Sequence, residues 1–166
     1  MEEYLDSMEM ALSELKRAEH SIYVSLRYAR NVEIIEGIIE RLIYSYESIF
    51  NALYYFKLEE SNIEEKDTIK ERIDLVLDLM EDDNLKQAST FYEFIKHLKN
   101  QNNLIENRYR RYFGIIYFLE DSFVYMLDID QMKEWLDLLK KHFIGAEDLI
   151  LSEEEKTRGK LAKWMF

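Results

Sequence analysis

The stretch NVEIIEGIIERLIYSYESIFNALYYF, residues 31–56, decides the fold, because its apolar residues recur every three or four positions. That spacing is typical of a helix that buries one stripe of side chains. One stripe consists of Ile35, Ile38, Leu42, Ile49, Leu53 and Phe56, and a second beside it of Ile39, Ile43, Tyr46 and Phe50. A helix so broadly apolar contacts several neighbours, so we expect it at the centre of a bundle, with Asn31 as its N-cap.

The preceding residues, 2–29, predict a second long helix. Its apolar stripe consists of Leu5, Met8, Leu12, Leu15, Ile22, Leu26 and Ala29. The stripe is interrupted at Glu19, which places a carboxylate on the buried seam. Small residues recur every seven positions beside it, at Ala11, Ala18 and Ser25, and they allow a neighbouring helix to approach closely. Because only a short turn separates the two helices, we expect them to form an antiparallel hairpin.

Downstream of residue 56, polar residues 59–66 predict a loop, and Asp67 or Thr68 is expected to cap a third helix that ends near residues 81–84. A fourth helix follows, weakens at residues 99–103 and is expected to resume through residues 104–112. Residues 112–128 fit helical spacing, but their β-branched and aromatic residues favour a small β-hairpin. Asp128 and Gln131 resemble a capping box, which begins a last helix. Its stripe consists of Met132, Leu136, Leu139, Phe143, Ala146 and Ile150, and residues 145–166 are expected to form a shorter helix or a tail.

The fold class that follows is all-α: an up-and-down helical bundle of about five helices in a single domain, residues 1–166, with a small β-hairpin near 112–128. The chain has no proline and only four glycines, which favours long helices. It has no cysteine, which excludes disulfides and thiolate sites. No signal peptide and no apolar run long enough to span a bilayer is visible, so we expect a cytoplasmic protein that does not contact a membrane. The net charge of −12 weighs against broad nucleic-acid binding.

The familiar catalytic and cofactor motifs are missing. None of the three histidines, His20, His97 and His142, follows a glutamate by three positions, as the di-iron bundle motif requires. Phosphate-binding glycine loops and the glycine-flanked serine of hydrolases are also missing. We therefore expect no metal, no cofactor and no catalytic residues of these kinds.

Two groups of polar residues are candidate binding sites: the helical stripe His20, Tyr23, Arg27 and Arg30, and the basic cluster Arg108, Arg110 and Arg111 in the segment NRYRRY. Arginine can pair with phosphate and tyrosine can stack on a base. Both groups also fit a solvated helix flank whose charges pair with the protein's own carboxylates. In the functional interpretation of the stripe, Glu19 beside His20 would fix the tautomer of the imidazole and raise its basicity, whereas a salt-bridged flank is the more common arrangement. The apolar end of the chain, Trp164, Met165 and Phe166, is expected to pack on the core or on a second subunit.

The stretch AEHSIYVSLRYARNVEIIEGIIERLIYSYESIFNALYYF, residues 18–56, together with DIDQMKEWLDLLKKHF, residues 128–143, resembles the archaeal HEPN-like proteins. The resemblance implies an up-and-down bundle, often dimeric, in a superfamily that includes RNA-cleaving toxins and partners of nucleotidyltransferases. Catalytic members carry an arginine followed four to six residues later by histidine. No arginine of this chain has a histidine at that spacing, so no nuclease residue can be assigned by resemblance.

These observations predict a non-catalytic, dimeric interaction protein of the HEPN-like kind that binds a protein partner, such as a nucleotidyltransferase, or RNA. One alternative is a ribonuclease in which His20 is the acid-base group and Arg27 or Arg30 stabilises the phosphorane. Another is a regulatory bundle that binds a small molecule in a pocket lined by Tyr44, Asn51 and Tyr55.

Overall fold

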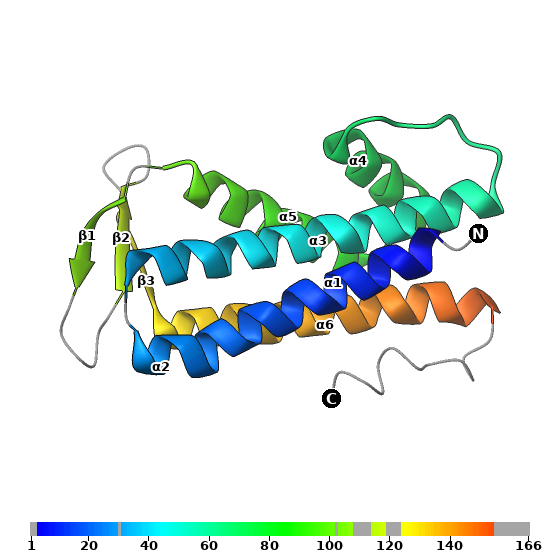
Figure 1. Ribbon diagram of the computed structural model, residues 1–166. Coiled ribbons are helices and arrows are strands. Elements are labelled where there is room, and N and C mark those ends of the chain that lie inside the picture. The colour runs from blue at the N-terminus through cyan, green and yellow to red at the C-terminus, as the bar shows by residue number, and fades with distance from the viewer. Residues whose placement is uncertain (1–2, 30, 102, 108–113, 119–123, 155–166) are drawn as a thin grey trace.

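The computed structural model describes residues 3–29, 31–101, 103–107, 114–118 and 124–154. The long helices α1 (Glu3–His20), α3 (Val32–Glu60), α5 (Asp83–Lys99) and α6 (Ile129–Glu154) run along the molecule, and α4 (Ile69–Met80) packs near one end (Figure 1). A small antiparallel sheet lies at the opposite end. The expected all-α bundle with a small β element is confirmed.

Helix α3 is the central element of the bundle, as its two apolar stripes predict. It contacts α1, α4, α5 and α6, and its most extensive contacts are with α1. All ten residues of its two predicted stripes are buried. The predicted hairpin of the first two long helices is therefore confirmed, and Figure 1 shows α1 and α3 side by side.

The expected N-caps are formed. The Asn31 side chain accepts a hydrogen bond from the Ile34 amide at 2.9 Å. Thr68 and Glu71 form a reciprocal capping box at the start of α4. Asp128 accepts a hydrogen bond from the Gln131 amide at 2.8 Å, which starts α6. Each of these side chains satisfies an amide that has no partner within its own helix.

The first helical segment contains a π-helical turn that the periodicity did not predict. α1 ends at His20, η1 (Ser21–Ser25) is π-helical, and α2 (Leu26–Tyr28) completes the segment. Ala18, Ile22 and Leu26 are all buried although successive members are four residues apart. In an α-helix each such step advances the side chain by about 40° around the axis, and the wider π-helical turn offsets part of this drift.

The hairpin expected near residues 112–128 is present as β2 (Gly114–Phe118) and β3 (Val124–Asp128), which pair antiparallel. The residues between these strands, 119–123, lie outside the described part of the chain. The expected return to helix through residues 104–112 is wrong for residues 104–107, which belong to β1 (Asn103–Asn107), the strand that pairs with β2. Residues 108–112 lie outside the described residues. This pairing provides the backbone partners that a helix would otherwise supply.

Helix α6 is longer than expected, because it continues through Gly145 to Glu154 as one element. Its six predicted stripe residues are each at most 2% exposed. The apolar end of the chain, residues 164–166, lies outside the described residues.

Candidate functional site

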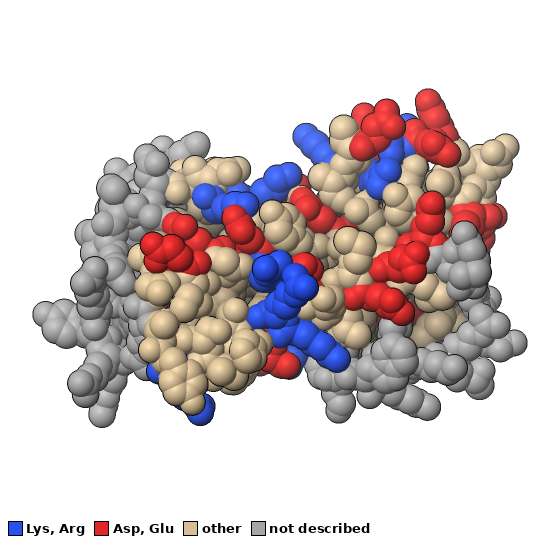
Figure 2. Space-filling view, in the orientation of Figure 1, with Lys and Arg blue, Asp and Glu red and all other residues tan. Residues whose placement is uncertain are grey.

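A basic hollow lies on the outer face of α1, where α1 runs beside α3. The hollow is open, has a volume of about 620 Å³, and is lined by Glu9, Leu12, Ser13, Lys16, Arg17, His20, Ser21 and Arg41. Figure 2 shows Lys and Arg side chains gathered over the middle of this face, with Asp and Glu side chains to either side. The lining supplies three permanent positive charges, on Lys16, Arg17 and Arg41, against the one carboxylate of Glu9, in a chain whose net charge is −12.

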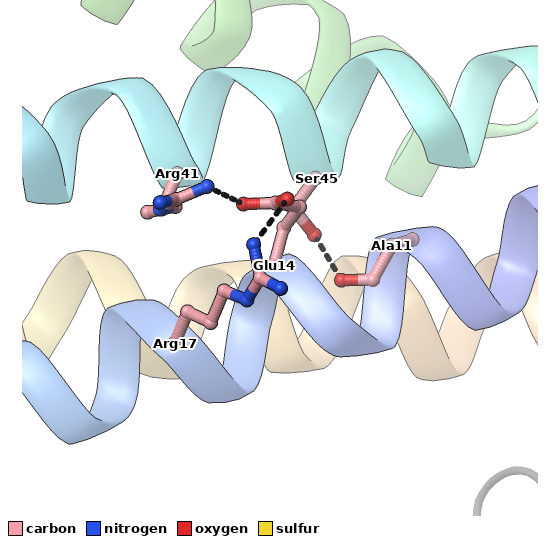
Figure 3. Close-up of polar contacts among 5 residues, drawn as sticks. All are labelled: Ala11, Glu14, Arg17, Arg41 and Ser45. Atoms are coloured by element: carbon pink, nitrogen blue, oxygen red, sulfur yellow. Dashed lines mark hydrogen bonds and ion pairs between the residues drawn. The ribbon is translucent and has the colours of Figure 1, made fainter.

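Glu14 holds two of the arginines in place at the edge of this basic hollow (Figure 3). Arg41 Nη1 lies 3.0 Å from Glu14 Oε2, and Arg17 Nη1 lies 3.6 Å from Glu14 Oε1. The Glu14 side chain is only 18% exposed, whereas those of Arg41 and Arg17 are 39% and 59% exposed. Pairs this accessible to water add less than about 1 kcal/mol to stability. Their main effect is to orient two guanidinium groups whose remaining N–H donors can bind an anion.

The structure separates the residues of the predicted polar stripe. His20 is exposed and lines the basic hollow, whereas neither Tyr23 nor Arg27 is part of its lining. The Tyr23 ring instead lies under the Lys133 ammonium, at 5.2 Å from Nζ to the ring centroid. Arg27 is exposed on α2. The other four candidates, Arg30, Arg108, Arg110 and Arg111, lie outside the described residues.

Glu19 pairs with a lysine and not with His20, as the salt-bridged interpretation of this flank has it. Its Oε2 atom accepts a hydrogen bond from Lys140 Nζ at 2.6 Å, which joins α1 to α6. The interruption in the apolar stripe is therefore an ion pair between helices.

The face of Tyr44, Asn51 and Tyr55, considered as a ligand pocket, is in part a contact with α4. Arg72 Nη1 donates to Asn51 Oδ1 at 3.0 Å and to Tyr55 Oη at 3.2 Å. The same guanidinium lies over the Tyr54 ring, 4.5 Å from its centroid. Two of the three expected pocket residues thus hold α4 against α3.

Sequence reasoning missed Lys16, Arg17 and Arg41 as members of a common site. Glu14 and Arg17 are three residues apart, so their pairing on one helix could have been inferred. Arg41 is 27 residues from Glu14 along the chain, and only the alignment of α1 with α3 brings the two together.

A second polar pair is buried in the core. Tyr46 Oη and His142 Nδ1 lie 2.7 Å apart, and the two residues are 0% and 1% exposed. Burial, with a smaller effect from the Lys141 charge, lowers the pKa of His142 to about 4. Burial also raises the pKa of Tyr46. Both side chains are therefore neutral near pH 7.

Comparisons with protein-family models, curated proteins and solved structures give no match to this chain. Among the described residues, no three or more His, Asp or Glu side chains are grouped so that they could hold a metal ion. Across the same residues, every helix is too short or too polar to cross a membrane.

The buried histidine makes stability depend on pH. The pKa of His142 is about 4 in the folded protein and near 6.5 in the unfolded chain, so only the unfolded state gains this proton between those values. We expect the His142 contribution to the free energy of unfolding to be complete above about pH 6.5 and to fall by about 1 kcal/mol by pH 5.5. Urea unfolding at several pH values measures this loss.

Two matched variants test whether His142 causes the pH dependence of stability. His142→Gln should flatten the pH dependence, whereas His97→Gln, the same change at an exposed position on α5, should retain the wild-type slope. If the free energy of unfolding depended on pH equally in wild type and His142→Gln, the buried imidazole would not be the source of the pH dependence.

Proposed function

We propose that this protein is a non-catalytic, dimeric interaction protein of the HEPN-like kind, and that its basic hollow binds an acidic segment of a protein partner. The observation that carries this proposal is the concentration of Lys16, Arg17 and Arg41 around one open hollow in a strongly acidic chain. A partner with carboxylates would pair with guanidinium groups that Glu14 already orients. The resemblance of residues 18–56 implies nucleotidyltransferases as one class of partner.

A protein partner fits this surface better than RNA does. Single-stranded RNA is usually bound by aromatic side chains on which bases stack, together with a positive groove along the backbone. None of the described residues that line the basic hollow is Phe, Tyr or Trp, and His20 supplies their one aromatic ring. The net charge of −12 would repel a long polyanion of either kind, so the hollow favours a short acidic segment whose charges it can neutralise.

A non-catalytic role is supported by the surroundings of His20, the residue that a ribonuclease mechanism would use. A catalytic imidazole is normally oriented by a second polar group. Glu19, the neighbouring carboxylate, is bonded to Lys140 instead. Arg27, proposed to stabilise the phosphorane, is not part of the lining that contains His20.

Binding of defined anionic probes tests the proposed role of the basic hollow. We expect a fluorescently labelled deca-glutamate peptide to bind wild type more tightly than a labelled uridine decamer does. Arg17→Glu should weaken peptide binding about tenfold or more, because it replaces a charged donor with a repelling group. Fluorescence anisotropy at about 0.15 M salt, where distant charges are screened, gives both affinities.

The matched control is Lys70→Glu, which makes the same charge change at an exposed position on α4 and should leave binding unchanged. If both variants lost the same peptide affinity, the net charge of the protein and not the basic hollow would determine binding. If the RNA bound more tightly than the peptide and Arg17→Glu abolished that binding, the partner would be a nucleic acid and not a protein. If the RNA were cleaved, the protein would be a ribonuclease and the non-catalytic proposal would be wrong. The hollow would have no binding role if neither probe bound.

Apolar side chains exposed at the end of the first helical segment support the proposed dimer. Tyr28 is 82% exposed and Val24 is 39% exposed, and the two lie four residues apart. Figure 2 shows uncharged side chains covering the α2 end of this face. Contact with a second copy would remove these side chains from water.

Sedimentation velocity should give the mass of a dimer for wild type at tens of micromolar protein. Tyr28→Glu should shift the mass to that of a monomer, because two buried carboxylates would then face each other across a symmetric contact. Tyr44→Glu, at a tyrosine on α3 that is 44% exposed, is the control and should remain dimeric. A wild-type monomer at high concentration contradicts the dimer.

A further inference from the structure

An apolar groove between α5 and α6 has a buried polar group in its lining. The groove is open, with a volume of about 620 Å³, and is lined by Lys86, Gln87, Thr90, Phe91, Phe94, Leu138 and His142. Lys86, Gln87 and Thr90 are exposed, the three apolar residues are half-buried, and His142 is 1% exposed. This gradient of exposure places polar side chains at the rim, apolar walls below them and His142 at the base.

One nitrogen of the histidine has no hydrogen-bond partner among the described residues. Nδ1 is engaged by the Tyr46 hydroxyl on α3, at 2.7 Å. Nε2 has less than 1 Å² exposed, and no side chain or backbone group of the described residues bonds to it. The Thr90 hydroxyl, a polar group of the same lining, donates to the Lys86 carbonyl at 3.0 Å. A buried imidazole nitrogen without a partner is destabilising, and a ligand that bonds to it would remove that cost.

The chemistry of the histidine limits the ligand. If the Tyr46 hydroxyl donates to Nδ1, the neutral ring carries its hydrogen on Nε2, and in the other tautomer Nε2 is an acceptor. A hydroxyl group fits both cases, because it can accept and donate. A carboxylate fits poorly, since at the base of an apolar groove it would lose its hydration for a single neutral donor.

We propose that this groove binds a small aromatic alcohol of the phenol class, with its ring against Phe91, Phe94 and Leu138 and its hydroxyl bonded to His142 Nε2. An aromatic ring can meet the Phe91 and Phe94 rings edge to face, an arrangement that Phe91 already makes with Tyr46. Because Nε2 is buried, side chains of the groove must move to admit the ligand. Lys86 and Gln87 are long and exposed and can move at low cost. The site is separate from the basic hollow on α1 and does not depend on it.

The test uses two ligands that differ in one hydroxyl group. Nitrogen-15 NMR of the His142 side chain is recorded in the full chain during titration with p-cresol and, separately, with toluene. We expect p-cresol to shift the Nε2 signal saturably and to bind about tenfold more tightly than toluene, the difference made by one hydrogen bond to a buried group. Equal affinities, or no shift of Nε2 with p-cresol, would overturn the proposal.

A substitution at the rim of the groove tests the binding site without altering the buried Tyr46–His142 pair. Thr90→Trp fills the groove from an exposed position and should weaken p-cresol binding about tenfold or more. Glu93→Trp places the same side chain on α5 at an exposed position outside the groove lining and should leave binding unchanged. Unchanged binding in Thr90→Trp would place the ligand elsewhere and reject the groove.

Discussion

The close contact between α1 and α3 is the constraint on which the rest of the structure depends. Ser45 Oγ on α3 donates to the backbone carbonyl of Ala11 on α1 at 2.8 Å, and both residues are fully buried (Figure 3). A side-chain hydroxyl can reach the backbone of a neighbouring helix only where small residues line the contact. Ala11 and Ala18 on α1, both 0% exposed, provide that space.

The position of α3 determines both candidate sites. On one side, its alignment with α1 brings Arg41 to Glu14 and thereby forms the basic hollow. On another side, Tyr46 of the same helix reaches His142 on α6 and fixes the imidazole at the base of the α5–α6 groove. A change in the distance between α1 and α3 would therefore alter the hollow directly. The groove is affected less, since it depends on the contacts of α3 with α5 and α6.

The helices were largely predictable from the sequence, because local periodicity determines which residues a helix buries. The stripe of α6 and the caps at Asn31 and Asp128 are examples. β1 was not predictable, because its five residues form a strand only through pairing with β2. His20 could be named as a candidate because it belongs to a local stripe on one helix. Arg41 could not, and neither could the pairing of Glu19 with Lys140, because that pairing joins residues 121 positions apart. The burial of His142 Nε2 away from any partner in the described part of the chain also depends on contacts between distant segments, which no short pattern encodes.

The most direct test of the close α1–α3 contact is the free energy of unfolding of Ala11→Leu, measured by urea titration beside Met10→Leu. Ala11 is 0% exposed and Met10 is 60% exposed, so the two variants introduce leucine at adjacent positions, one buried and one exposed to solvent. Ala11→Leu should lose about 1–3 kcal/mol or more, because the added volume forces the helices apart and lengthens the Ser45 bond. Met10→Leu should change stability by less than about 0.5 kcal/mol. Equal stabilities of Ala11→Leu and wild type would contradict the close packing of these two helices.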